Sequence, residues 1–140
     1  MFSARFFPAY GVTIFCAPGC PAQADDLLDH RLLFVWDELG EPERVRELLG
    51  RYAPFAPAAL PNYARRSQHA GENWTYALAE REGATTLGFV LLGLTDAELE
   101  QIDDYEGAPV HKVRYALSVR VGDIERVAGV YLAAGSYLGE

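Results

Sequence analysis

The stretch KVRYALSVRVGD, residues 112–123, decides the fold of the C-terminal half of this chain. Apolar and polar side chains alternate through its first ten residues, which predicts a strand with one buried and one solvated face. Gly122 and Asp123 then supply a two-residue turn with glycine first. The segment RVAGVYLAA, residues 126–134, provides the returning strand. The sequence therefore predicts a β-hairpin whose first strand buries Val113, Tyr115, Leu117, Val119 and Val121.

A short helix is expected just before this hairpin, in TDAELEQIDDYEG, residues 95–107. Thr95 followed three residues later by Glu98 is the signature of a capping box. Leu99 and Ile102 are spaced to face a core, and the helix is expected to end near Gly107.

The end of this helix is crowded with the four carboxylates of Glu100, Asp103, Asp104 and Glu106. A helix C-terminus carries partial negative charge and normally favours basic side chains. The cluster is therefore either a solvated acidic turn or a place where one carboxylate is held to accept a proton.

The upstream half of the chain alternates between strand and helix patterns. LLFVW at 32–36 suits a buried strand, and EPERVRELLGRY at 41–52 has helical spacing, with Pro42 in its first turn and Gly50 as a stop. The Pro-rich segment 53–64 must be irregular or extended. Segments 73–79 and 85–94 read as two strands, the second apolar enough to be buried on both faces. This order predicts an α+β fold with a mainly antiparallel sheet.

Composition limits the classes of function. The 140 residues, half of them hydrophobic, are enough for one domain with a real core. A balance of 12 basic to 20 acidic residues argues against nucleic acids and anionic membranes as partners. Cys16 and Cys20 are too few for a metal site without clustered histidines, so they are interpreted as two incidental thiols and no metal is expected.

Residues 1–30 differ from the rest and are interpreted as an N-terminal extension, either disordered or a weak signal-like segment. An apolar run from Phe6 to Cys16 is followed by small residues up to Ala24, but Pro8 and Gly11 interrupt it. No segment reaches the roughly 20 apolar residues of a transmembrane helix. The expected compartment is the cytoplasm, with export as the alternative if residues 1–24 are a signal peptide.

From about residue 31 to 134 the chain resembles the gamma-glutamylcyclotransferase-like family. The resemblance rests on LLFVWDELG at the opening, IDDYEG in the middle, and KVRYALSVRV and GVYL at the end. It implies that residues 31–140 form a small mixed, mainly antiparallel β-barrel with flanking short helices. The domain should then not need residues 1–28.

The activity implied by the resemblance is an intramolecular cyclisation. A γ-glutamyl amine or amide becomes 5-oxoproline and releases its amine, with no cofactor, because the nucleophile is already tethered to the carbonyl. The partner is a small-molecule γ-glutamyl compound; the sequence does not determine an oligomeric state. The family's general acid/base corresponds to Glu106, whose pKa could be raised by burial and by the neighbouring Asp103 and Asp104.

The chain departs from the family pattern at the substrate loop. The family has YGTL or YGSN there, whereas this chain has Trp36, Asp37, Glu38 and Leu39, which are the expected substrate-binding residues. Two acids beside a carboxylate-binding loop would repel a glutamyl carboxylate. Lys112 also stands where the family has a tyrosine. The chain is therefore either an enzyme with an altered substrate or a catalytically degenerate member that acts as a small-molecule-binding or interaction module.

Overall fold

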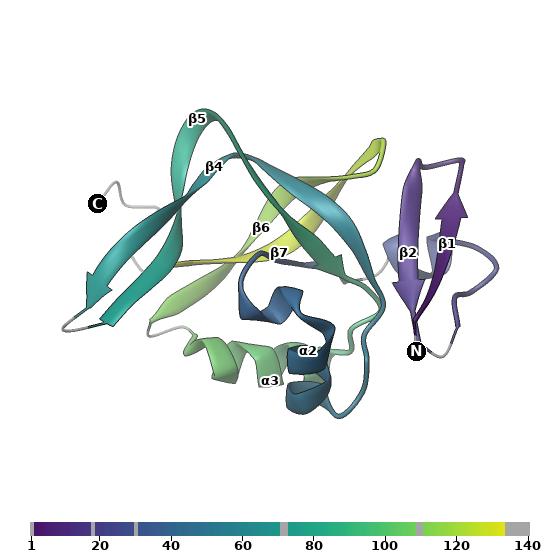
Figure 1. Ribbon diagram of the computed structural model, residues 1–140, viewed down its shortest axis with the longest axis horizontal. Coiled ribbons are helices and arrows are strands. Elements are labelled where there is room, and N and C mark those ends of the chain that lie inside the picture. The colour runs from purple at the N-terminus through teal and green to yellow at the C-terminus, as the bar shows by residue number, and fades with distance from the viewer. Residues whose placement is uncertain (1, 18, 30, 71–72, 109–110, 134–140) are drawn as a thin grey trace.

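The protein forms a five-stranded barrel flanked by helices and an extra hairpin (Figure 1). The computed structural model describes residues 2–17, 19–29, 31–70, 73–108 and 111–133. Neighbouring strands around the barrel follow the order β4, β5, β3, β7 and β6, and pairing of β4 with β6 closes it. The strands are β3 (Leu33–Val35), β4 (Phe55–Ala70), β5 (Asn73–Leu91), β6 (Lys112–Val121) and β7 (Ile124–Ala133).

One strand pair makes the barrel mixed. β3 runs parallel to β7 and antiparallel to β5, and the other barrel pairs are antiparallel. The predicted α+β class with a small, mainly antiparallel barrel is therefore confirmed.

The helices lie on the segments that connect strands. A short 3-10 helix η1 (Glu38–Gly40) and α2 (Pro42–Leu49) follow β3, and α3 (Asp96–Glu106) precedes β6. In Figure 1, α2 and α3 pack side by side below the barrel. A further short helix, α1 (Asp25–Leu28), leads into β3.

The local signals in the sequence produce the expected elements. Gly50 ends α2 in the left-handed conformation, and Thr95 and Glu98 form the complete capping box of α3. Leu99 and Ile102 are buried on the inner face of α3. Gly122 and Asp123 connect β6 and β7 in register from Val121↔Ile124 to Lys112↔Ala133, so the predicted hairpin is confirmed.

Two expectations for the middle of the chain are wrong. Segments 73–79 and 85–94 belong largely to one strand, β5, rather than to two. β5 pairs with β4 on both sides of a register shift between Pro61 and Tyr63. Segment 85–94 is not buried on both faces, since Leu87 is 71% exposed. The Pro-rich segment is extended and enters β4, where proline is tolerated because β4 forms a continuous ladder only with β5.

The N-terminal segment forms a β-hairpin. Strands β1 (Ser3–Phe7) and β2 (Val12–Cys16) pair with each other, and β2 also touches β4. Val12 and Ile14 are at most 2% exposed and belong to the same apolar cluster as Phe34 of the barrel. This burial argues against the expectation that the domain does not need residues 1–28.

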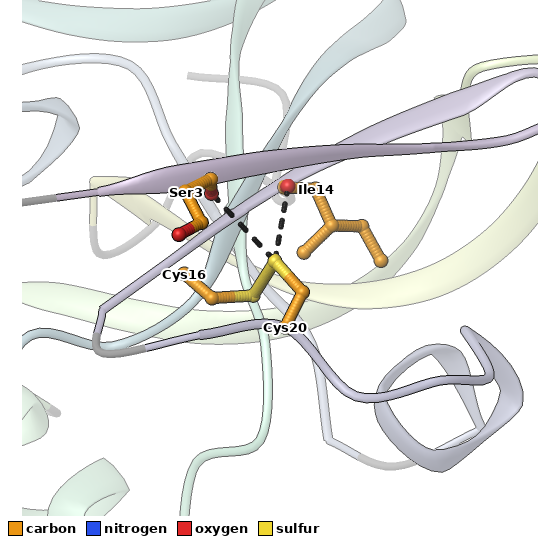
Figure 2. Close-up of a disulfide and its surroundings, with 4 residues drawn as sticks. All are labelled: Ser3, Ile14, Cys16 and Cys20. Carbon is orange, nitrogen blue, oxygen red and sulfur yellow. Dashed lines mark hydrogen bonds between the residues drawn. A yellow bond between two sulfur atoms is a disulfide. The ribbon is translucent and has the colours of Figure 1, made fainter.

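A disulfide joins Cys16 to Cys20 at the end of this hairpin (Figure 2). The expectation of two incidental thiols is wrong, because the Cα atoms of Cys16 and Cys20 lie 5.1 Å apart, within the range that a disulfide spans. The Cys20 sulfur lies 3.6 Å from the Ser3 carbonyl oxygen and 3.3 Å from that of Ile14. A bonded sulfur has no proton to donate, so these are packing contacts that hold the turn against the hairpin.

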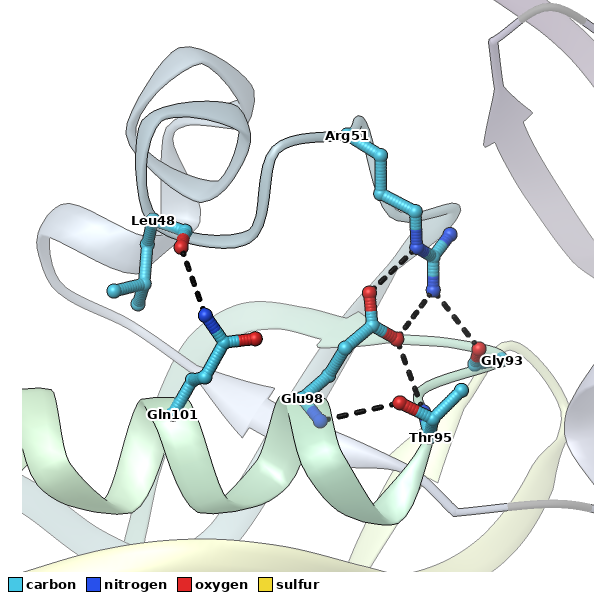
Figure 3. A network of polar contacts seen from close by, with 6 residues as sticks. All are labelled: Leu48, Arg51, Gly93, Thr95, Glu98 and Gln101. Carbon is cyan, nitrogen blue, oxygen red and sulfur yellow. Dashed lines mark hydrogen bonds and ion pairs between the residues drawn. The ribbon is translucent and has the colours of Figure 1, made fainter.

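A charged network fixes α3 to the segment that leaves α2 (Figure 3). Arg51 donates to both carboxylate oxygens of Glu98, at 2.6 and 2.8 Å, and to the carbonyl oxygen of Gly93 at 3.0 Å. Glu98 also accepts from the Thr95 backbone N–H. Burial raises the pKa of Glu98, but the Arg51 and Thr95 hydrogen bonds outweigh it and hold that pKa below its ordinary value.

The contact between the N-terminal hairpin and the β6–β7 turn can be tested at Gly122. Both Gly122 and the exposed Gly83 have positive φ, but a Cβ on Gly122 would collide with the Gly11 backbone, whereas Gly83 has nothing within 4 Å. We expect Gly83→Ala to cost about 1–2 kcal/mol, the strain of the left-handed conformation. Gly122→Ala should cost about 1–3 kcal/mol more, because the hairpin must shift. Urea unfolding of both variants measures this difference, and equal losses would mean that the hairpin does not dock there.

The Glu98 network predicts a pH-dependent stability. A carboxylate whose pKa is lowered in the folded state stabilises the protein above its unfolded pKa, and this contribution is lost as the pH falls through the folded pKa. Glu98→Gln should therefore cost about 1–3 kcal/mol at pH 7, and less at about pH 3. The exposed Glu100 on the same helix provides the control Glu100→Gln. Denaturant unfolding at the two pH values measures the loss of unfolding free energy in each variant. A loss in Glu98→Gln that is the same at both pH values would contradict the prediction.

Candidate active site

Glu106 lies where α3 ends against the barrel. It is the last residue of α3, and Gly107 follows in the left-handed conformation, which turns the chain sharply towards β6. The Glu106 side chain is only 7% exposed. It lines a cavity of about 10 Å³, room for no more than about one water molecule. The other lining residues are Phe34, Val35, Trp36, Asp37, Lys112 and Tyr131.

Lys112 is the direct partner of Glu106. Its Nζ donates to Oε2 of Glu106 at 2.9 Å, and its side chain is 31% exposed, so the pair connects the cavity to solvent. Burial raises the pKa of Glu106, and Lys112 only partly offsets this effect. Asp37 and Glu38 raise the pKa further through their charges, so the net shift of the Glu106 pKa is upward.

The carboxylates that act on Glu106 are not the ones expected from the sequence. Asp104 is exposed, and Asp103 forms its own network with Arg114 and Tyr131. Arg114 donates to both oxygens of Asp103, at 2.9 and 3.1 Å, and the Tyr131 hydroxyl donates to one of them. Although burial raises the pKa of Asp103, these bonds hold it below the ordinary value. Asp103 therefore fastens α3 to β6 and β7.

The four predicted loop residues have different environments. Trp36 and Asp37 line the cavity with Glu106. Glu38 is exposed and accepts from the Tyr105 hydroxyl at 3.0 Å, which ties the loop to α3. Leu39 is 1% exposed and belongs to the second apolar cluster of the core, so it does not line the cavity.

The two polar cavity residues Lys112 and Tyr131 were not among the predicted site residues. Tyr131 belongs to GVYL, the closing-strand motif, and burial and the Asp103 hydrogen bond raise its pKa. Lys112 stood out in the sequence only as a departure from the family pattern. Its period-two position on β6 could have indicated that it shares a face with Arg114, but not that it meets Glu106.

Solved structures with similar folds define the class of this barrel. An Arabidopsis thaliana protein studied in solution is 25% identical, with a TM-score of 0.65 over 76% of this chain. The chain covers 63% of that protein's length. A gamma-glutamyl cyclotransferase is 16% identical, with a TM-score of 0.62. The match covers 74% of this chain and 66% of the length of that protein. The fold is therefore a cyclotransferase-like barrel.

The sequence comparison identifies the family. The model described as gamma-glutamyl cyclotransferase, AIG2-like, matches residues 33–139, so the chain belongs to this family. An AIG2-like protein from Mus musculus is 24% identical, with a TM-score of 0.55. The match covers 75% of this chain and 79% of the length of that protein. Among curated proteins, no sequence matches the chain.

Replacing Glu106 tests its electrostatic state. Because the pKa of Glu106 is raised, the folded state binds more protons than the unfolded state between the two pKa values, and stability falls as the pH rises through that window. Glu106→Gln removes the ionisable group and with it this loss of stability. The variant should therefore be as stable as the wild type or more stable at pH 7, with its relative advantage shrinking towards pH 4. Thermal melts across this range measure the trend, and a large loss at pH 7 would make Glu106 a structural residue.

Proposed function

We propose that the protein is a gamma-glutamylcyclotransferase-like enzyme that cyclises a γ-glutamyl amine or amide to 5-oxoproline. One observation carries this proposal. A buried glutamate with a raised pKa lies in a cavity between the end of α3 and the loop after β3. A carboxylate with a pKa shifted towards neutrality is suited to take a proton and return it within one catalytic cycle. The substrate is a small molecule, and the γ-glutamyl group is part of the proposal.

The proposed reaction uses Glu106 twice. Its carboxylate takes a proton from the substrate's α-ammonium, and the freed amine attacks the γ-carbonyl carbon to form a ring. The tetrahedral intermediate then collapses, the bond from that carbon to the leaving nitrogen breaks, and Glu106 returns its proton to the departing amine. The ring nitrogen gives up its second proton as the lactam forms, and the departing amine takes up this proton too. The products are 5-oxoproline and the amine as its ammonium ion. The chain must hold the substrate folded on itself, because proximity supplies much of the acceleration.

A second function is favoured by the size of the cavity. About 10 Å³ cannot hold a glutamyl group unless side chains move. A degenerate member that kept the fold and acts as a binding or interaction module without turnover does not need to admit a glutamyl group to this cavity. This alternative predicts binding of a ligand or partner without release of 5-oxoproline.

The compartment also belongs to the proposal. Cleavage after Ala24 would remove β1 and β2, which contribute to the core, so residues 1–24 are proposed to stay on the chain, as a cytoplasmic protein requires. The disulfide favours export instead, because such bonds persist mainly in oxidising compartments. The proposal rests on the core packing of β1 and β2. None of the helices described has the length and hydropathy that crossing a bilayer requires.

The activity is tested by assaying release of 5-oxoproline from a panel of γ-glutamyl amines, amides and peptides. Glu106→Gln should lower turnover by about 100-fold or more, the usual effect of removing a general base. Asp104→Asn is the matched control, since it removes a nearby but exposed carboxylate and should change turnover little. Equal turnover in Glu106→Gln and the wild type would rule out the assigned base.

A further inference from the structure

We propose that Lys112 is the substrate-binding residue for the α-carboxylate, and that before substrate binds the Lys112 ammonium occupies the position on Glu106 that the substrate's α-ammonium takes. The proposal rests on the proposed function, because it concerns the same site. It assigns to one lysine the part of substrate recognition for which the loop after β3 is poorly suited.

The loop after β3 is poorly suited to bind an anion. The Leu39 N–H donates to the Asp37 side chain at 3.3 Å, and the Gly40 N–H donates to the Asp37 carbonyl oxygen at 2.8 Å. The Glu41 N–H donates to the Glu38 carbonyl oxygen at 3.0 Å. Three successive backbone donors are therefore used within the loop, and two carboxylates stand beside them. A carboxylate approaching this loop meets like charge, and these three N–H groups are not free to bind it.

Lys112 supplies positive charge next to Glu106, whereas Arg44 is paired with the exposed Glu38 at 3.8 Å. Among the described residues that line the cavity, Lys112 is the one basic side chain. Arg114 is engaged by two hydrogen bonds to Asp103. Arg65 donates to the Trp36 carbonyl oxygen and lies over the Trp36 ring from the exposed side. A carboxylate that enters the cavity therefore has Lys112 as its available cation.

The Glu106–Lys112 pair has the same two charges as an α-amino acid. A substrate carries its ammonium and its carboxylate on one carbon, so it can replace both halves of the pair at once. The substrate's ammonium takes the place of Nζ on Glu106, and its carboxylate then accepts from the displaced Nζ. No charge is left buried without a partner during this exchange, which keeps the cost of binding low.

Movement of Lys112 also makes room for the substrate. With Lys112 on Glu106 the cavity holds about 10 Å³, and the lysine side chain is the cavity's partly exposed, flexible wall. When it swings towards solvent to meet the carboxylate, it vacates the space next to Glu106. The same residue therefore covers Glu106 before substrate binds and selects ligands that carry an α-carboxylate.

The test uses two ligands that cannot be cyclised and that differ only in the carboxylate: L-2-amino-4-methoxybutanoic acid and 3-methoxypropylamine. Titration calorimetry measures their affinities for the wild type, Lys112→Met and Lys112→Arg. Arg66→Met is the control, because it removes one positive charge from an exposed position on β4. Thermal melts establish that each variant is folded, and Lys112→Gln is the second variant if the methionine form is not.

We expect the wild type to prefer the amino acid. Lys112→Met should weaken amino-acid binding by about 10- to 100-fold, the effect of one charge-assisted hydrogen bond. Binding of the amine should stay the same or tighten, because Glu106 is freed. Lys112→Arg should keep part of the preference, and Arg66→Met should behave as the wild type.

The outcomes separate this inference from the proposed function. The role of Lys112 would be overturned if Lys112→Met lowered the affinity for both ligands equally or for neither. It would also be overturned if the wild type bound neither ligand. If the wild type releases 5-oxoproline while Lys112→Met keeps an unchanged KM, the enzyme stands and the inference fails. If the amino-acid preference depends on Lys112 but no 5-oxoproline forms, the inference stands and the enzymatic function fails.

Discussion

The barrel depends on the close packing of β3 between β5 and β7. Leu33, Phe34 and Val35 are at most 2% exposed, and they join two strands that are far apart in the sequence. A Cβ on Gly88 of β5 would collide with the Val35 carbonyl oxygen, and one on Gly129 of β7 would crowd Leu33 and Arg114. Glycine at these two positions lets the neighbouring backbones approach, so a three-residue strand is enough to complete the sheet.

The site follows from the position of this strand. Where β3 ends, Trp36 and Asp37 leave the barrel beside the C-terminus of α3, which brings Glu106 to the same place. The bonds of Asp103 to Arg114 and Tyr131 fix α3 to the hairpin, and the bonds of Arg51 to Glu98 fix its N-terminal end. Glu106 is therefore held by a helix tied at both ends, which gives its carboxylate a defined position in a largely dehydrated environment.

Opposing electrostatic effects set the pKa of Glu106. Burial opposes ionisation of Glu106, the two loop acids add to that effect, and Lys112 counters it from the solvent side. A buried carboxylate without a partner would be costly, whereas one with a mobile partner can exchange it for a ligand. Two departures from the family pattern, Asp37 and Lys112, line the same cavity, and a third, Glu38, acts on Glu106 through its charge.

The sequence by itself determined the elements that short-range chemistry controls. Alternation specified β6, the Gly122–Asp123 turn joined it to β7, and Thr95 with Glu98 set the start of α3, because each depends on neighbours a few residues away. The IDDYEG motif also indicated the family and singled out Glu106. Only the tertiary structure decided that Lys112 contacts Glu106, that Asp103 belongs to Arg114 and Tyr131, that Leu39 is core, and that the N-terminal hairpin packs against the barrel. These contacts depend on which strands pair across the barrel, and pairing between distant segments leaves no periodic trace in a single sequence.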